Sequence, residues 1–151
     1  MKKLMVIFAG IMIFLSASSF TEKDPANENE NVTKVFNADF AGATEVTWKE
    51  KGSFYFANFT LNDKIMAAAY DENGKLVATS RLIPREEVPA KLLKRAEGNF
   101  RNGHSGPYVA ELTYEGQTSY FFDIVTDRFV ISCNADPDGV ITEDSRMKLQ
   151  K

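Results

Sequence analysis

The sequence predicts an α+β protein in which helices pack on antiparallel sheets. Runs of alternating apolar and polar residues, typical of half-buried strands, are separated by short turn signals. Two helical stripes, at residues 32–40 and 92–100, each precede such a series of strands. The same order of elements therefore occurs twice. This repetition predicts two tandem units, each a helix packed on a four-stranded antiparallel sheet.

The first 19 residues have the three parts of a secretory signal peptide. Lys2 and Lys3 precede an apolar run at residues 4–15, and residues 17–19 are small, as cleavage requires. The apolar run is shorter than the roughly 20 residues that a membrane-spanning helix needs. No cysteine follows the run, so a lipid anchor has no attachment atom. We expect a mature protein in the periplasm or outside the cell, with no membrane anchor after cleavage.

The composition of the mature chain limits its partners. Once Lys2 and Lys3 are removed, 16 basic and 21 acidic residues leave a net charge of −5. A nucleic-acid-binding protein would cluster Lys and Arg on one face, so no nucleic-acid partner is expected. Cys133 is the only cysteine, which excludes an intramolecular disulfide, and we expect it to be buried in its strand. Stability must then come from a packed core, for which twelve Phe residues supply much of the material.

The first predicted unit spans residues 32–83. It follows a polar, acidic segment, residues 20–31, which we expect to be a flexible leader. Asn31 is the expected cap of the first helix. The apolar stripe of this helix consists of Val32, Val35, Phe36 and Phe40. The turns between its strands are expected at Lys51-Gly52, Asn62-Asp63 and Asn73-Gly74.

The second predicted unit spans residues 84–151. Its helix is expected to start near Pro89, and an irregular, mobile loop is expected at residues 101–107. The strand turns are expected at Glu115-Gly116, Thr126-Asp127 and Asp138-Gly139. At an offset of 65 residues, Tyr55, Ala57 and Phe59 match Tyr120, Phe122 and Ile124. This correspondence favours a duplication over chance similarity of two amphipathic segments.

A family resemblance rests on motifs in the first unit. They are Val46-x-Trp48, Tyr55-x-Ala57-x-Phe59 and the turn Tyr70-Asp71-x-Asn73-Gly74-Lys75, and they follow a signal peptide. In this order they resemble the small secreted PepSY-like proteins, a family similar to the β-lactamase-inhibitor protein. The resemblance covers most of the mature chain and implies helices on one face of an antiparallel sheet, with a binding or inhibitory role rather than catalysis. β-Lactamase inhibition itself is not implied, because that inhibitor is disulfide-bonded and this chain has one cysteine.

Phe54, Phe56 and Phe121 are the first candidate partner-binding residues. If Ala57 faces the helix, the alternation of a strand places Phe54 and Phe56 on the opposite face, with Phe121 at the equivalent place in the second unit. Two interpretations follow. The aromatic side chains form an accessible surface for a protein or peptide of the cell envelope, or they are buried where the two units pack.

The loop at residues 101–107 is the second candidate partner surface, through Asn102 and His104. His104 also raises an alternative function, an envelope hydrolase. No second His, no pair of cysteines and no nucleophile-elbow motif accompany it, although Ser105 is adjacent. The sequence favours a solvated loop histidine, and no catalytic residue is expected.

The turn around Asp136 and Asp138 imitates the first half of a calcium loop. Alternate oxygen-bearing side chains are followed by Gly139, but the twelfth position, Ser145, is not the glutamate that completes such a loop. Asp-Gly is also a common hairpin turn. Calcium therefore stays an alternative cofactor, and a calcium-responsive structural protein an alternative function; no other cofactor is expected.

The sequence as a whole predicts a secreted or periplasmic binding module without enzymatic activity. Its partner is expected to be a protein or peptide of the cell envelope, and inhibition of a hydrolase or peptidase is the more specific form of this function. We expect a monomer or a weak dimer.

Overall fold

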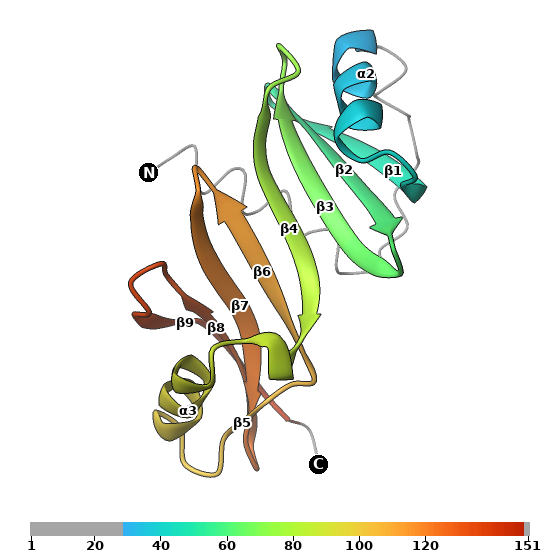
Figure 1. Ribbon diagram of the computed structural model, residues 1–151. Coiled ribbons are helices and arrows are strands. Elements are labelled where there is room, and N and C mark those ends of the chain that lie inside the picture. The colour runs from blue at the N-terminus through green and yellow to red at the C-terminus, as the bar shows by residue number, and fades with distance from the viewer. Residues whose placement is uncertain (1–28, 150–151) are drawn as a thin grey trace. The chain divides into compact units, whose positions relative to one another are not determined.

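The computed structural model describes residues 29–149 (Figure 1). The predicted signal peptide, residues 1–19, lies outside the described residues, as does residue range 20–28 of the predicted leader. The chain divides into two compact units, the first ending at Arg81 and the second beginning at Leu82. Both contain a helix and antiparallel strands, so the predicted α+β class is confirmed.

The first unit contains one helix and an antiparallel meander in which each strand pairs with the next. Its elements are α2 (Glu30–Asp39), β1 (Thr44–Lys51), β2 (Phe54–Leu61), β3 (Lys64–Asp71) and most of β4 (Leu76–Pro84), whose last three residues belong to the second unit. Asn62 and Asp63 form the two-residue turn between β2 and β3, with φ angles of 51° and 61°. Positive φ at both positions is typical of the tight hairpin turn that Asn and Asp tolerate, so this turn lies where it was predicted.

Helix α2 begins slightly earlier than predicted. The side chain of Asn29, not Asn31, caps the helix: its Oδ1 accepts a hydrogen bond from the backbone N–H of Val32 at 3.2 Å. An N-cap side chain satisfies one of the N–H groups that the first turn leaves unpaired. Glu30 and Asn31 therefore belong to the helix rather than to a flexible leader.

The core of the first unit is a cluster of rings between α2 and the sheet. Phe36 projects from α2, and its ring centroid lies 5.0 Å from those of both Trp48 and Phe59. Tyr70 is fully buried, and its hydroxyl donates to Asp39 Oδ2 at 3.0 Å. Burial, together with this hydrogen bond, raises the pKa of Tyr70 above its usual range.

The second unit also places a helix beside an antiparallel meander. Its elements are η3 (Arg85–Glu87), α3 (Ala90–Gly98), β5 (His104–Ser105), β6 (Tyr108–Tyr114), β7 (Gln117–Val125), β8 (Phe129–Ala135) and β9 (Ile141–Lys148). Strands β6 to β9 pair in sequence order, and β5 pairs with β7. The loop at residues 101–107 is thus partly a strand, which corrects the expectation of an irregular segment.

The core of the second unit lies between α3 and strands β7 and β8. Leu93 and Ala96 of the helix pack in one cluster with Ile124, Ile131 and Cys133. Cys133 is buried, as predicted, and burial raises the pKa of its thiol to about 11. The thiol therefore stays protonated at neutral pH and is a poor nucleophile.

In the part of the chain that the structure describes, neither helix is long and apolar enough to cross a membrane.

Candidate functional site

The predicted aromatic face is not accessible at its central residue. Phe56 is 1% exposed, while Phe54 and Phe121 are half-buried. The predicted alternation itself is confirmed, because Ala57 and Phe59 pack in the core cluster with α2. Phe56 is thus buried in this structure, and a role for it in partner binding stays a prediction.

The residues next to Phe56 in the sheet are small. Phe56 of β2 pairs with Ala69 of β3, and Ala69 pairs with Ala78 of β4. These two alanines are buried as well. Phe56 is thus a large ring flanked in the sheet by two small side chains.

The structure separates His104 from the serine beside it. Both residues lie in β5, where successive side chains point to opposite faces. His104 is exposed, whereas Ser105 is buried and its Oγ donates to Glu97 Oε1 at 2.9 Å. A nucleophilic serine needs a base within hydrogen-bonding distance. This arrangement gives the adjacent His104 and Ser105 no such contact.

Glu97 of α3 holds β5 in place through one oxygen. Oε1 accepts hydrogen bonds from the backbone N–H of Ser105 at 2.9 Å and from Arg85 Nη2 at 3.1 Å. Arg85 in turn donates to the carbonyl of Ser105 at 3.2 Å. The Ser105 backbone hydrogen bond, followed by its hydroxyl and the Arg85 charge, lowers the pKa of Glu97 against the opposing effect of burial. These hydrogen bonds attach Ser105, in the loop after α3, to Glu97 of the helix.

Replacing Glu97 by alanine is expected to lower the free energy of unfolding by about 1–3 kcal/mol, because the buried N–H and O–H of Ser105 lose their acceptor. The pKa of Glu97 is lower in the folded than in the unfolded protein, so its stabilisation is present above the unfolded pKa and is lost as the pH falls through the folded pKa. Urea denaturation of Glu97→Gln should show a shallower loss of stability towards acid pH than the wild type. Glu86→Gln, at an exposed carboxylate, is the control; parallel pH curves for wild type and Glu97→Gln would contradict the assignment.

Asp136 and Asp138 lie in a turn in which the Asp136 carboxylate already accepts backbone hydrogen bonds. Asp136 Oδ1 accepts hydrogen bonds from the backbone N–H groups of Asp138 at 3.0 Å and Val140 at 2.8 Å. Such contacts stabilise a turn without an ion. Among residues 29–149, no group of three His, Cys, Asp or Glu side chains is placed to hold a metal ion. Calcium binding at this turn stays a prediction.

A pocket of about 520 Å³ lies in the second unit, and we call it the arginine pocket. It is lined by residues 99–102, at the end of α3 and in the loop after it, and by residues 126–129, at the turn between β7 and β8. Ile131 of β8 and Arg146 of β9 complete the lining. Its volume falls within the range of about 300–1,000 Å³ that is usual for ligand pockets. Asn102 is the one predicted site residue that lines it.

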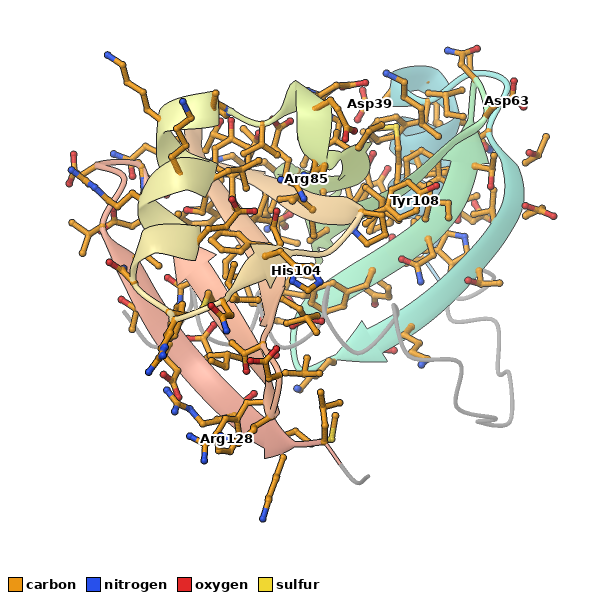
Figure 2. The ribbon with its side chains drawn as sticks, turned by 90° about the horizontal axis from the view of Figure 1, so that it is seen from below. Asp39, Asp63, Arg85, His104, Tyr108 and Arg128 are labelled. Atoms are coloured by element: carbon orange, nitrogen blue, oxygen red, sulfur yellow. The ribbon has the colours of Figure 1, made fainter. Side chains whose placement is uncertain are left out.

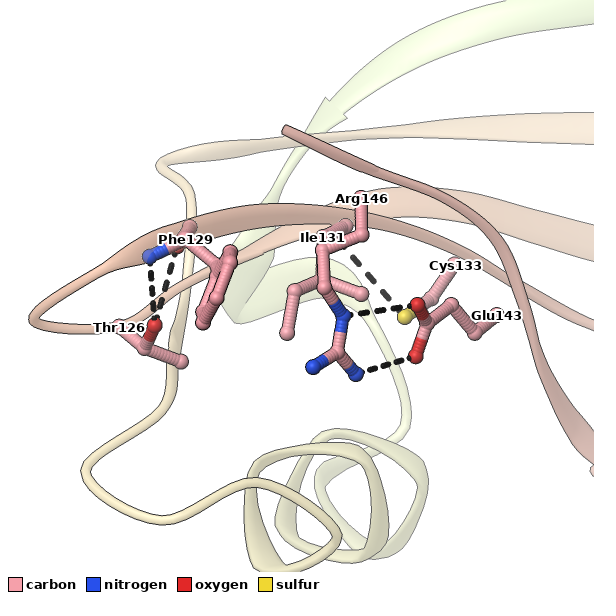
Figure 3. A network of polar contacts seen from close by, with 6 residues as sticks. All are labelled: Thr126, Phe129, Ile131, Cys133, Glu143 and Arg146. Carbon is pink, nitrogen blue, oxygen red and sulfur yellow. Dashed lines mark hydrogen bonds and ion pairs between the residues drawn. The ribbon is translucent and has the colours of Figure 1, made fainter. Parts of the chain in front are cut away.

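Hydrogen bonds fix both loops of the arginine pocket. Asn102 Nδ2 donates to Asp127 Oδ2 at 3.0 Å, which joins one loop to the other. Thr126 Oγ1 accepts from the backbone N–H of Phe129 at 2.9 Å and so shapes the turn (Figure 3). Next to Asn102, a Cβ on Gly103 would lie 2.8 Å from Ile124 Cγ2, so only glycine lets the loop approach β7 this closely.

The charge of the pocket lining is predominantly positive. Its ionisable side chains are those of Arg101, Arg128, Arg146 and one acid, Asp127. Arg146 forms a bidentate ion pair with Glu143: its Nε donates to Oε1 at 2.9 Å and its Nη2 to Oε2 at 2.7 Å (Figure 3). Neither Arg101 nor Arg128 forms an ion pair with any residue between 29 and 149. Two guanidinium groups are thus available to an anion.

An aromatic ring lies beneath these charges. The guanidinium carbon of Arg128 is 5.7 Å from the centroid of Phe129, and that of Arg146 is 5.2 Å from the same centroid. Both distances allow a cation–π interaction. Arg128 itself lies at the turn between β7 and β8 (Figure 2). The pocket therefore combines positive charge with apolar surface.

Sequence reasoning did not identify the arginines or Phe129 as a site. They belong to three separate segments, and no short motif joins them. The only local signals were the loop with Asn102 and the turn at Thr126-Asp127. A pocket assembled by strand pairing has no fixed spacing in the sequence.

Comparison with known proteins gives matches among solved structures. The sequence matches no protein-family model and no curated protein. A BLIP-like protein from Bacteroides fragilis superposes with a TM-score of 0.59 and 16% identity, over 81% of this chain and 86% of that one. The chain has the fold of the BLIP-like proteins. The predicted resemblance is thus confirmed for the fold.

Two further structures share the BLIP-like fold of this chain. A DUF2874 family protein from Bacteroides uniformis has a TM-score of 0.62 and 17% identity, over 78% of this chain and 87% of that one. A candidate periplasmic protein from Bacteroides eggerthii has a TM-score of 0.62 and 15% identity, over 79% of this chain and 87% of that one. At these identities the likeness is one of fold.

Proposed function

We propose that this BLIP-like chain is a secreted or periplasmic binding module without enzymatic activity, and that it takes its protein or peptide partner at the arginine pocket. The observation that carries the proposal is a pocket lined by Arg101 and Arg128, neither of which forms an ion pair within residues 29–149, with Arg128 over the ring of Phe129. Arginine and aromatic residues are enriched in protein interfaces. The signal-peptide pattern at residues 1–19 and the fold shared with a candidate periplasmic protein support the location.

A binding role is also favoured by the state of the reactive side chains. The hydroxyl of Ser105 is buried and donates to Glu97, and the thiol of Cys133 is buried and protonated. His104 is exposed on the opposite face of β5 from Ser105. Inhibition of a hydrolase or peptidase is the finer form of the proposal, in which the partner is an enzyme held at the arginine pocket.

The two units are further proposed to be tandem copies of one ancestral helix-and-sheet unit. The strongest support is a shared turn at an offset of 65 residues. Asp71 Oδ1 accepts from the backbone N–H groups two and four residues on, and Asp136 does the same. Gly74 and Gly139, three residues after each aspartate, both have positive φ. The two units therefore share the hydrogen bonds of this turn as well as the order of their elements, as two copies of one unit would.

Co-purification from the native cell envelope tests the binding role. The tagged mature protein is compared with an Arg101→Ala/Arg128→Ala double variant and with Lys91→Ala/Lys94→Ala, which removes the same charge from the exposed face of α3. We expect wild type and the lysine control to retain the same macromolecule and the arginine variant to lose it. A wild-type protein that retains no macromolecule would overturn the proposed function, and retention by all three would overturn its site.

A further inference from the structure

We infer that the arginine pocket recognises a peptide carboxylate next to an apolar side chain, with the carboxylate at Arg101 and Arg128 and the apolar group against Phe100 and Phe129. This inference rests on the proposed function and names the chemistry of its partner. A guanidinium group presents N–H donors in a planar fork that matches a carboxylate.

The donors that such a carboxylate needs are present in the lining. Arg101 has no hydrogen bond or ion pair within residues 29–149, and the contact of the Arg128 guanidinium is with the face of Phe129. Arg146 uses Nε and Nη2 on Glu143, which leaves its Nη1 able to donate. The guanidinium groups of Arg128 and Arg146 both lie near the ring of Phe129, so a carboxylate bound there would meet positive charge from each.

The single acid of the lining favours a peptide over a phosphate. The Asp127 carboxylate uses Oδ2 to accept from Asn102, so Oδ1 can accept the backbone N–H of a peptide. A phosphate dianion offers no N–H and is repelled by Asp127 more strongly than a carboxylate monoanion is. The pocket thus offers donors for a carboxylate and an acceptor for a backbone N–H, both of which an extended peptide can use.

The apolar part of the lining selects what stands next to the carboxylate. Phe100 and Phe129 border the same pocket as the arginines, and both remain partly exposed. An aromatic or large aliphatic side chain would cover this surface, whereas a small free carboxylate would leave it exposed to water. The matching ligand is therefore an acidic group joined to an apolar residue.

Binding of short peptides to the mature protein tests the inference. The probes are acetyl-Ala-Phe-Glu-amide and acetyl-Ala-Phe-Ala with a free C-terminus, which separate an acidic side chain from a chain end as the source of the carboxylate. Acetyl-Ala-Phe-Gln-amide is the matched neutral probe, and sodium acetate and inorganic phosphate are the small anions. Dissociation constants come from calorimetry, and NMR shifts of the backbone amides of residues 99–102 and 126–129 locate the site.

We expect at least one carboxylate peptide to shift those amides and to bind at least tenfold more tightly than the neutral peptide, acetate and phosphate. The Arg101→Ala/Arg128→Ala variant should lose at least tenfold in affinity, with Lys91→Ala/Lys94→Ala unchanged. Unchanged circular dichroism and melting temperature verify folding, and Arg101→Gln/Arg128→Gln serves as a second variant. Equal binding of charged and neutral peptides, or preference for phosphate, overturns the inference; arginine-dependent retention of an envelope partner would still leave the proposed function standing.

Discussion

Replacing Phe36 by alanine is expected to lower the free energy of unfolding by about 3–5 kcal/mol, because a fully buried ring leaves a cavity as well as losing its transfer free energy. Phe36 is 2% exposed, and its ring lies between those of Trp48, Phe59 and Phe40, with centroids at 5.0, 5.0 and 5.5 Å. Helix α2 has only two buried residues, so this side chain carries much of its attachment to the sheet. Urea denaturation followed by circular dichroism measures the change.

The control for Phe36→Ala is Ile65→Ala in β3 of the same unit. Ile65 is 54% exposed, and substitution at an exposed position usually changes stability by less than about 0.5 kcal/mol. If Phe36→Ala cost no more than this control, the ring cluster would not be the core of the first unit.

Replacing Phe56 by alanine is expected to cost a similar amount, about 3–5 kcal/mol. The ring is 1% exposed, and its neighbours in the sheet, Ala69 and Ala78, are buried and too small to fill the space it leaves. Thermal and urea unfolding measure the loss. The matched control is Tyr108→Ala, at an aromatic residue that is 58% exposed.

The result at Phe56 also separates the two interpretations of the aromatic residues. A variant that kept wild-type stability but lost its partner would restore Phe56 as a binding residue. A destabilised variant establishes it as a core residue, as its burial indicates.

The strand order of each unit is predictable because hairpins depend on local chemistry. Asn62 and Asp63 tolerate the positive φ of a tight turn, and the alternation at Ala57 and Phe59 identifies the side that faces α2. The other side is not predictable in this way. Alternation distinguishes the two faces of a strand but does not say whether the second face is also covered. Residues 67–70 are all buried, and this continuous apolar run was the signal that sequence reasoning missed.

Short or charged strands escape prediction for a different reason. Strand β5 has two residues, too few to show any period. Strand β9 is exposed along nearly its whole length, so its polar residues have no apolar alternation beyond Val140 and Ile141. Arg146 lies in this exposed strand, so no pattern in the sequence marked it as a site residue.

The arginine pocket is a product of tertiary structure. The loop with Asn102 was a candidate because loops present side chains, but its partner Asp127 stands 25 residues away. Only the pairing of β5 with β7 and of β8 with β9 brings Arg101, Arg128 and Arg146 to one pocket.

Site-specific photocrosslinking in cells that make the protein examines the binding role of the arginine pocket directly. A photoreactive amino acid is placed at Asn99, an exposed residue of the pocket lining, and in a separate variant at Ile65, which is exposed in the first unit. We predict a crosslinked adduct from position 99 that disappears with Arg101→Ala/Arg128→Ala, and none from position 65. An adduct from position 65 with none from position 99 would contradict binding at the arginine pocket.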